Sequence, residues 1–196
     1  SAFEGCAFIT GVTIPDTVTL IGSYAFKDCG MLSDIYIPDS VNEIGRLIVA
    51  GTEYINKDSN WQNGVLYCGK HLLNMRLEFS GSYRIKEGTK TIAWDAFASC
   101  ILLKSVVIPD SVIYIGCDAF HSCDSLVMVT LPQYITEIES GLFAYCTSLL
   151  DITIPDSVTR IGECAFLGCS GLETLDMSAN IKAIESSAFV SYVGLL

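Results

Sequence analysis

Ile154-Pro155-Asp156-Ser157-Val158-Thr159-Arg160-Ile161-Gly162 is one copy of a unit that recurs every 23 residues along the chain. Near-copies start at Ile14, Ile37, Ile108 and Leu131, and weaker copies start at Ile85 and Met177. Only the step from Ile37 to Ile85 breaks the count, because it spans 48 residues, two more than two periods. A fixed period of this length predicts a solenoid, in which each coil packs on the next one.

Length and composition agree with one continuous stack. The 196 residues are 51% hydrophobic and 17% charged, which suits about eight coils sharing a core that runs along the whole solenoid. We predict a single solenoid over residues 1–196, with regular repeats at 1–49 and 84–196 and an irregular, hairpin-bearing insert at 50–83. Because the sequence opens and closes partway through a repeat, with no signal peptide at its start, we expect it to be part of a longer protein.

The charge of the chain limits its partners. The net charge of −11 disfavours nucleic acid and anionic lipid, which both need a positive protein surface. No apolar run approaches the ~20 residues of a membrane helix, so we expect no membrane insertion by this chain. The distribution is uneven, since residues 57–104 carry seven of the eleven bases and only four acids. This basic segment coincides with the break in the period.

Aligning the repeats places residues of one type in columns. The phenylalanine column holds Phe3, Phe26, Phe97, Phe120, Phe143, Phe166 and Phe189, with Val49 as the exception. The isoleucine column holds Ile21, Ile44, Ile92, Ile115, Ile138, Ile161 and Ile184. Coils stacked ~4.8 Å apart as parallel strands bring such residues into contact, so we expect these columns to form the core.

Each coil combines three local signals. Leu149, Ile152 and Ile154 end in a period-two alternation, which predicts a short strand with one buried face. Proline follows at once and ends the strand, because it has no backbone donor. Val158 to Gly162 then predicts a second short extended piece, and Ala-Phe-x-x-Cys predicts a single helical or 3-10 turn.

The whole pattern, Leu-x-x-Ile-x-Ile-Pro-x-x-Val-x-x-Ile-Gly-x-x-Ala-Phe-x-x-Cys, resembles the BspA-type leucine-rich repeat over about four-fifths of the chain. The resemblance implies a right-handed leucine-rich-repeat solenoid, with short parallel strands on a concave sheet and extended pieces and turns on the convex side. It also implies a cell-surface or secreted protein of a bacterium or a mucosal protozoan. Several members of the family are adhesins for host matrix or plasma proteins or for other microbes. The family has no catalytic residues to carry over.

Six of the nine cysteines share one column: Cys6, Cys29, Cys100, Cys123, Cys146 and Cys169. A metal column, stacked disulfides and a column of small buried residues all fit this spacing. We favour buried, reduced thiols, because side chains that point the same way make poor disulfide geometry. Cys117-Asp118 with His121 and Cys123 resembles a metal site only superficially, and we expect no metal and no cofactor.

The break in the period leaves two interpretations open. Tyr54-Ile55 is a candidate strand, residues 56–60 read as a loop, and Gly64–Tyr67 and His71–Met75 flank a hairpin turn at Cys68-Gly69-Lys70. The insert either bends the solenoid or protrudes to contact a partner. For a protrusion, the contact residues are Trp61, Tyr67, Lys70, His71 and Arg76.

The outward-facing strand residues form the second candidate surface. By alignment the candidates for partner contact are Asp34, Tyr36, Arg84, Val107, Met128, Thr130, Asp151, Thr153 and Asp176, and Ser82, Ser105 and Thr174 share the face. Solenoids commonly bind proteins on such a surface, but an ordinary solvated sheet face would have the same alternation.

Signals for catalysis are weak. The sequence has no zincin, hydrolase-elbow, P-loop, EF-hand or dinucleotide motif, and its two histidines, His71 and His121, are both expected outside the core. One aspartate per coil falls short of the six to eight oxygens that calcium takes, so Asp16, Asp39, Asp110 and Asp156 are better read as turn residues.

We therefore expect a non-catalytic binding or adhesion module. Its partner would be a host matrix or plasma protein, another microbial surface protein or a surface glycan, and the chain itself would be monomeric. The alternative is a passive stalk or spacer within a larger cell-surface protein.

Overall fold

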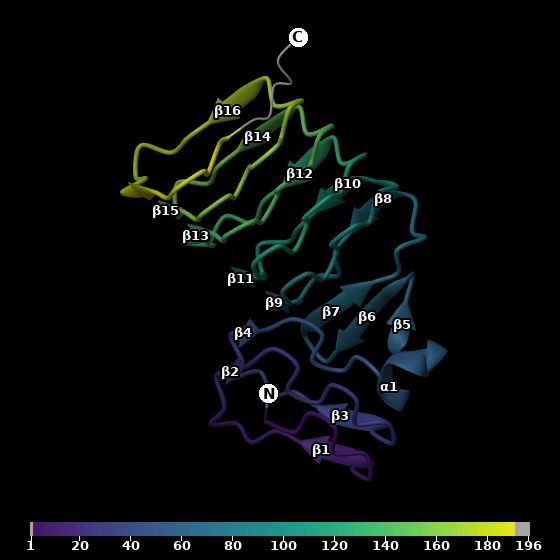
Figure 1. Ribbon diagram of the computed structural model, residues 1–196. Coiled ribbons are helices and arrows are strands. Elements are labelled where there is room, and N and C mark those ends of the chain that lie inside the picture. Colours follow the sequence, from purple (N-terminus) through teal and green to yellow (C-terminus); the bar gives the residue numbers. More distant parts are fainter. Residues whose placement is uncertain (1, 191–196) are drawn as a thin grey trace.

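The computed structural model describes residues 2–190 as a solenoid of about eight turns (Figure 1). Each regular coil has two short strands, and like strands of successive coils form two rows. The first row is β1 (Gly11–Thr13), β3 (Asp34–Tyr36), β8 (Gly81–Arg84), β10 (Leu103–Val107), β12 (Met128–Thr130), β14 (Asp151–Thr153) and β16 (Thr174–Asp176). The second row is β2 (Leu20–Ile21), β4 (Glu43–Ile44), β9 (Thr91–Ile92), β11 (Tyr114–Ile115), β13 (Glu137–Ile138), β15 (Arg160–Ile161) and β17 (Ala183–Ile184).

Wherever neighbouring strands of a row pair, they run parallel, as the repeat predicts. Val106 on β10 pairs with Val129 on β12, one period later, and Ile161 on β15 pairs with Ile184 on β17. Outside the insert, the 23-residue period is therefore also the register of the sheets, which confirms the parallel solenoid.

The turn after the second strand is not helical, so that part of the prediction is wrong. Within residues 2–190, helices are assigned only in the insert. Each regular turn instead has two residues in the left-handed region, such as Asp118 (φ 56°) and Ser122 (φ 55°). This backbone directs the amide of Phe120 to the carbonyl of Leu142 in the next coil (3.0 Å), so the turns form a third row of coil-to-coil hydrogen bonds. A helical turn would keep those bonds within the coil.

The phenylalanine column forms the centre of the core. The rings of Phe97 and Phe120 stack with centroids 4.8 Å apart, and the stack continues through Phe143 and Phe166 to Phe189. The four inner rings are almost completely buried. Full burial of such a side chain contributes about 1.5–3 kcal/mol, so the column is a large share of the stability.

The insert contains α1 (Glu53–Asn56), η1 (Asp58–Asn60), β5 (Trp61–Gln62), β6 (Val65–Cys68) and β7 (His71–Met75). The predicted hairpin is confirmed, because β6 and β7 pair antiparallel, and β7 also pairs in parallel with β9. The candidate strand at Tyr54-Ile55 is a helical turn instead. Thr52 is its N-cap, and the Thr52 hydroxyl accepts a hydrogen bond from the amide of Ile55 (3.4 Å).

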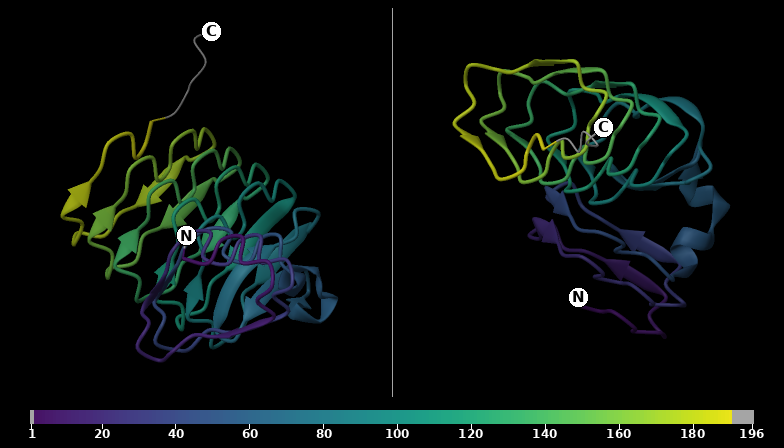
Figure 2. Two further views of the ribbon diagram at one scale, coloured as in Figure 1. Left: turned by 60° about the horizontal axis from the view of Figure 1, so that its bottom comes forward. Right: turned by 45° about the horizontal axis from the view of Figure 1, so that its top comes forward.

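The hairpin is an internal partition and not a protrusion. It lies between the two N-terminal coils and the C-terminal coils (Figures 1 and 2). Leu66 and Leu73 belong to the core cluster of the N-terminal coils, whereas Val65 and Leu72 belong to the cluster of the C-terminal coils. The two faces of one hairpin therefore complete two separate cores, and this explains why the period breaks here.

Candidate binding surfaces

The strand face consists of the outward side chains of the first row. Ile35 is buried between Asp34 and Tyr36, which are both exposed, and the same alternation holds for β12 and β14, whereas the central Leu175 of β16 is half-buried. All nine predicted contact residues reach this face, although Val107 is half-buried. Their outward orientation is therefore confirmed, whereas their role as partner contacts stays a prediction.

The nine residues do not form one continuous sheet. Asp34 and Tyr36 lie on β3, which pairs only with β1 among the described strands, and the hairpin separates them from Arg84 on β8. The prediction that Tyr36 and Arg84 act on one face therefore divides into two smaller surfaces. The larger surface extends from β8 to β16.

A hollow of about 370 Å³ interrupts the larger surface between β12 and β14. These strands lie next to each other, but within residues 2–190 no backbone ladder joins them. Four of the predicted residues line the hollow, namely Met128, Thr130, Asp151 and Thr153. The structure thus brings these four together, in a site with an apolar Met128 side chain at one wall and carboxylates of Asp151 and Asp156 at the other.

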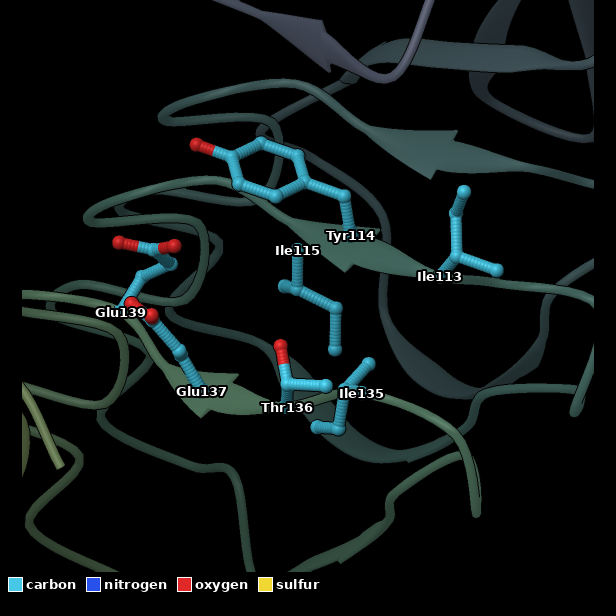
Figure 3. Close-up of a pocket in the computed structure, with 7 residues that line it drawn as sticks. All are labelled: Ile113, Tyr114, Ile115, Ile135, Thr136, Glu137 and Glu139. Carbon is cyan, nitrogen blue, oxygen red and sulfur yellow. The ribbon is translucent and has the colours of Figure 1, made fainter. Parts of the chain in front are cut away.

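A second crevice, of about 220 Å³, opens in the second row between β11 and β13 (Figure 3). Ile115 and Ile135 line its apolar wall, and Glu137 and Glu139 lie at its other end. No ladder joins β11 to β13 in the described part of the chain.

Glu139 stands in a column that glycine occupies in four other coils. A Cβ on Gly45 would lie 2.4 Å from the amide nitrogen of Ser23 in the preceding coil, and one on Gly162 would lie 2.6 Å from that of Ser140. Glycine permits this close approach of two backbones, and Glu139 takes its place at the joint that is open. Glu185 occupies the same column where β15 and β17 do pair, and β17 has no further pairing partner among the described strands. Burial raises the pKa of the Glu139 carboxyl.

Two of the five predicted hairpin contacts are buried, which corrects their assignment. His71 is fully buried, and its ring nitrogens lie 2.9 Å from the Thr91 hydroxyl and 3.2 Å from the Pro38 carbonyl. Tyr67 is also buried, and its hydroxyl lies 3.3 Å from that of Tyr83. Both side chains are covered because coils pack on each face of the hairpin, so neither can contact a partner.

The other three hairpin contacts reach the surface. The guanidinium of Arg76 lies 4.8 Å from the ring centroid of half-buried Trp61 and pairs with Asp58 at 2.6 Å. Lys70, at the hairpin turn, pairs with Asp39. Trp61 and Arg76 lie on the α1 side of the insert and Lys70 at its turn, so they do not form one cluster.

Sequence reasoning missed a clamp across the partition. Arg46 of the coil before the insert pairs with Asp95 (3.2 Å) and Asp118 (3.2 Å) of two coils after it, and it lies over the ring of Trp94. Burial raises the pKa of Asp95, and Arg46 opposes that shift. The available signal was an arginine in a column that holds serine at Ser23 and Ser140.

The cysteine column is buried except at its first member, Cys6, which is exposed, and all nine cysteines are free. Four thiols of the column donate to the carbonyl of the phenylalanine in the preceding coil, as Cys123 does to Phe97 (3.1 Å) and Cys146 does to Phe120 (3.1 Å), and Cys29 and Cys169 do the same. Burial raises the pKa of Cys100 to about 12 and that of Cys169 to about 11, so these thiols stay protonated at neutral pH. Within residues 2–190 no three histidine, cysteine or acidic side chains converge as a metal site, and no helix is long and apolar enough to span a membrane.

Solved structures similar to this chain are leucine-rich repeat proteins. A leucine rich cell surface protein of Faecalibacterium prausnitzii is 28% identical with a TM-score of 0.59, covering 99% of this chain and 66% of its own. A leucine-rich repeat protein of Bacteroides ovatus is 32% identical with a TM-score of 0.50, and the match covers 94% of this chain and 42% of that protein's chain. The pneumococcal vaccine antigen PcpA shares the fold at 18% identity, with a TM-score of 0.61 and coverage of 93% and 55%.

The chain therefore spans about two-thirds or less of the length of these structures. Among curated proteins, none matches the chain significantly. The family model for the BspA type leucine rich repeat region matches six copies, over residues 1–76 and 81–195. With its 23-residue register, stacked phenylalanines and two rows of parallel strands, this chain belongs to the BspA-type leucine-rich repeat family.

Proposed function

We propose that the chain is a non-catalytic binding module of a cell-surface or secreted protein, and that it engages another protein through the strand face from β8 to β16. The inward columns repeat the same residue types from coil to coil, whereas the outward residues change at each strand. The fold explains the first pattern but not the second, because exposed positions on a paired strand accept many residue types.

The hollow between β12 and β14 is the observation that carries the proposal. It combines a concave shape with an exposed apolar side chain, Met128, and the carboxylate of Asp151, and the surrounding coils hold both in place. A flexible methionine and a nearby charge suit contact with a protein that presents an apolar residue beside a basic one. Rigid display limits the ordering cost of binding. The cell-surface assignment draws support from the F. prausnitzii protein, which is described as one.

The test is binding of purified plasma and matrix proteins to the immobilised chain. The variant Met128→Ala, Asp151→Ala, Thr153→Ala should lower the affinity for a bound protein at least tenfold, about 1.4 kcal/mol. The matched control is Leu77→Ala, Glu173→Ala, Thr136→Ala, which alters three exposed residues of the same kinds outside the hollow. Equal affinities for the two variants would refute the strand face as the contact surface.

A rigid spacer is the second candidate. The observation that favours it is the unbroken stack of rings from Phe97 to Phe189, together with turn hydrogen bonds between all of those coils. Such a stack resists bending. If the chain binds none of the proteins tested while a longer form of the protein does, the spacer is the better description.

A further inference from the structure

We propose that Lys70, Arg84, Lys86 and Lys90 form a binding edge for a polyanionic polysaccharide, one with sulfate or carboxylate groups along its chain. We call these four residues the basic edge. The inference rests on the proposed binding function and adds a second surface, with the class of ligand that it takes.

The basic edge is assembled where the hairpin turn meets the next coil. The amide of Lys90 donates to the carbonyl of Lys70 (2.7 Å), which fixes the two backbones side by side. Arg84 is the last residue of β8, and Lys86 follows it by two positions. The ammonium of Lys86 lies 5.9 Å from the ring centroid of Tyr67, on the hairpin. A hollow of about 240 Å³ lies between the two turns, lined by Gly69, Lys70, Lys86, Glu87, Gly88 and Thr89.

The fold does not require Lys86 to be a base, whereas the ammonium of Lys90 donates to the backbone carbonyl of Asp39. Lys86 stands in the column that holds Pro38 and Pro109 in neighbouring coils, and its turn keeps the same hydrogen bond. The amide of Thr89 donates to the Lys86 carbonyl at 3.1 Å, as that of Val112 does to Pro109 at 3.0 Å. A lysine here therefore adds a charge without adding a contact that the turn needs.

The local charge is opposite to that of the body. Four bases face two acids, Asp39 and Glu87, whereas the chain as a whole has a net charge of −11. Lys70 pairs with Asp39 and lowers the pKa of that carboxyl, so these two side chains largely neutralise each other. Arg84 and Lys86 are exposed and leave the edge positive, which concentrates anions there.

The chemistry of the hollow favours a polysaccharide over an acidic protein. Protein interfaces rely on buried aromatic or aliphatic anchors, and the lining of this hollow offers glycines, a threonine and charged side chains. Three of the four bases are lysines, which present mobile, strongly hydrated point charges. Such charges fit a solvated chain of sulfates or carboxylates, which binds by many exchangeable ion pairs.

The probe for this surface is a sulfated heparin-type octasaccharide, with the chemically desulfated octasaccharide as the ligand control. The chain should bind the sulfated form, and the affinity should fall as the salt concentration rises. The variant Lys70→Gln, Lys86→Gln, which removes the two bases that line the hollow and leaves the strand face unchanged, should bind at least tenfold more weakly. Lys104→Gln, Lys182→Gln is the matched control, because it removes the same charge from exposed residues on other coils. It should bind as the wild type does.

Three outcomes would overturn the proposal: no binding of the sulfated octasaccharide at low salt, equal affinity of the two double variants, or tighter binding of poly-glutamate than of the octasaccharide. Thermal unfolding of both variants at the wild-type temperature shows that any loss is not a folding defect. The hollow between β12 and β14 is untouched in these variants. Loss of octasaccharide binding with protein binding intact therefore separates this edge from the proposed strand-face function.

Discussion

The guanidinium of Arg46 lies 3.2 Å from the carboxylate of Asp118, a residue 72 positions away on the far side of the hairpin. Because Arg46 also pairs with Asp95, one side chain ties the N-terminal coils to two C-terminal coils. The three side chains are only about one-quarter to one-third exposed, so solvent screens the pairs less than at an open surface.

Arg46→Ala should lower the free energy of unfolding by about 1–2 kcal/mol, because it leaves two partly buried carboxylates without their cation. Chemical denaturation followed by circular dichroism measures the change. Lys182→Ala, at an exposed position, is the control. If the two variants unfold alike, the clamp contributes nothing to stability.

Leu66→Ala should lower the free energy of unfolding by about 2–5 kcal/mol, since Leu66 is fully buried against the N-terminal core. Hydrogen exchange should show the largest loss of protection in the N-terminal coils, residues 11–49, and a smaller loss in the C-terminal coils, residues 103–184. Leu77→Ala, where the leucine is exposed, should change neither. A uniform loss of protection would mean that the hairpin does not separate two cores.

His71 should make the protein less stable in acid. Burial lowers its pKa, and Lys90 and Lys70 lower it further, while the Pro38 carbonyl and Asp39 raise it. In the unfolded chain the pKa is about 6.5, so the unfolded state takes up the proton first. The stability due to neutral His71 is complete above that pH and is lost as the pH falls below it.

The measurement compares wild type with His71→Asn between pH of about 7.5 and about 5, where histidine titrates. Other groups titrate equally in both proteins, so the difference in unfolding free energy isolates His71. The wild type should lose its advantage as the pH falls. A difference that stays constant with pH would contradict the assignment, and His121→Gln serves as the control for a half-buried histidine.

Glu139→Gly should raise the unfolding temperature and close the crevice between β11 and β13. The glycine removes a half-buried carboxyl whose pKa is raised by burial and restores the close backbone approach of the column. The backbone entropy of a new glycine opposes this by about 0.5–1 kcal/mol. Slower hydrogen exchange at residues 136–139 would report the new ladder. Glu185→Gly, in a coil whose strands already pair, should produce no such protection.

Alkylation under native conditions should label Cys6 first, because it is the one exposed cysteine, and then half-buried Cys117 and Cys164. The six buried thiols should react only after unfolding, since burial keeps thiols such as Cys100 protonated. Peptide mass spectrometry after timed labelling measures the order. Nine alkylated cysteines in denatured, unreduced protein are expected, and fewer would reveal disulfides.

The repeat made most of the fold predictable. Once Phe120 and Phe143 are placed in one column, the period fixes which side chains face inward, and the outward positions such as Met128 follow by alternation. The signal for the buried hairpin was also present, because Val65 to Cys68 is a continuous apolar run, which is typical of a strand covered on both faces. Of the two interpretations of the insert, this run therefore favours a hairpin within the solenoid over a protrusion.

Other features leave no mark in a single sequence. Left-handed backbone at Tyr24 and Leu47 is imposed by the coil-to-coil hydrogen bonds, against the usual preference of those residues. The hollow between β12 and β14 depends on a small separation of two strands with ordinary sequences. The pairing of Arg46 with Asp118 depends on how far the insert moves the flanking coils, and no period predicts that distance.

The two-sided hairpin also gives the molecule a modular architecture. Because β6 and β7 end one stack of side chains and begin another, a duplication or loss of a 23-residue unit on one side leaves the contacts on the other side unchanged. Chimeras joined at this hairpin should therefore accept a whole N-terminal segment from a relative. In such exchanges, the hairpin, its clamp and the hydrogen bond from the Trp94 amide to the Ile44 carbonyl would have to match.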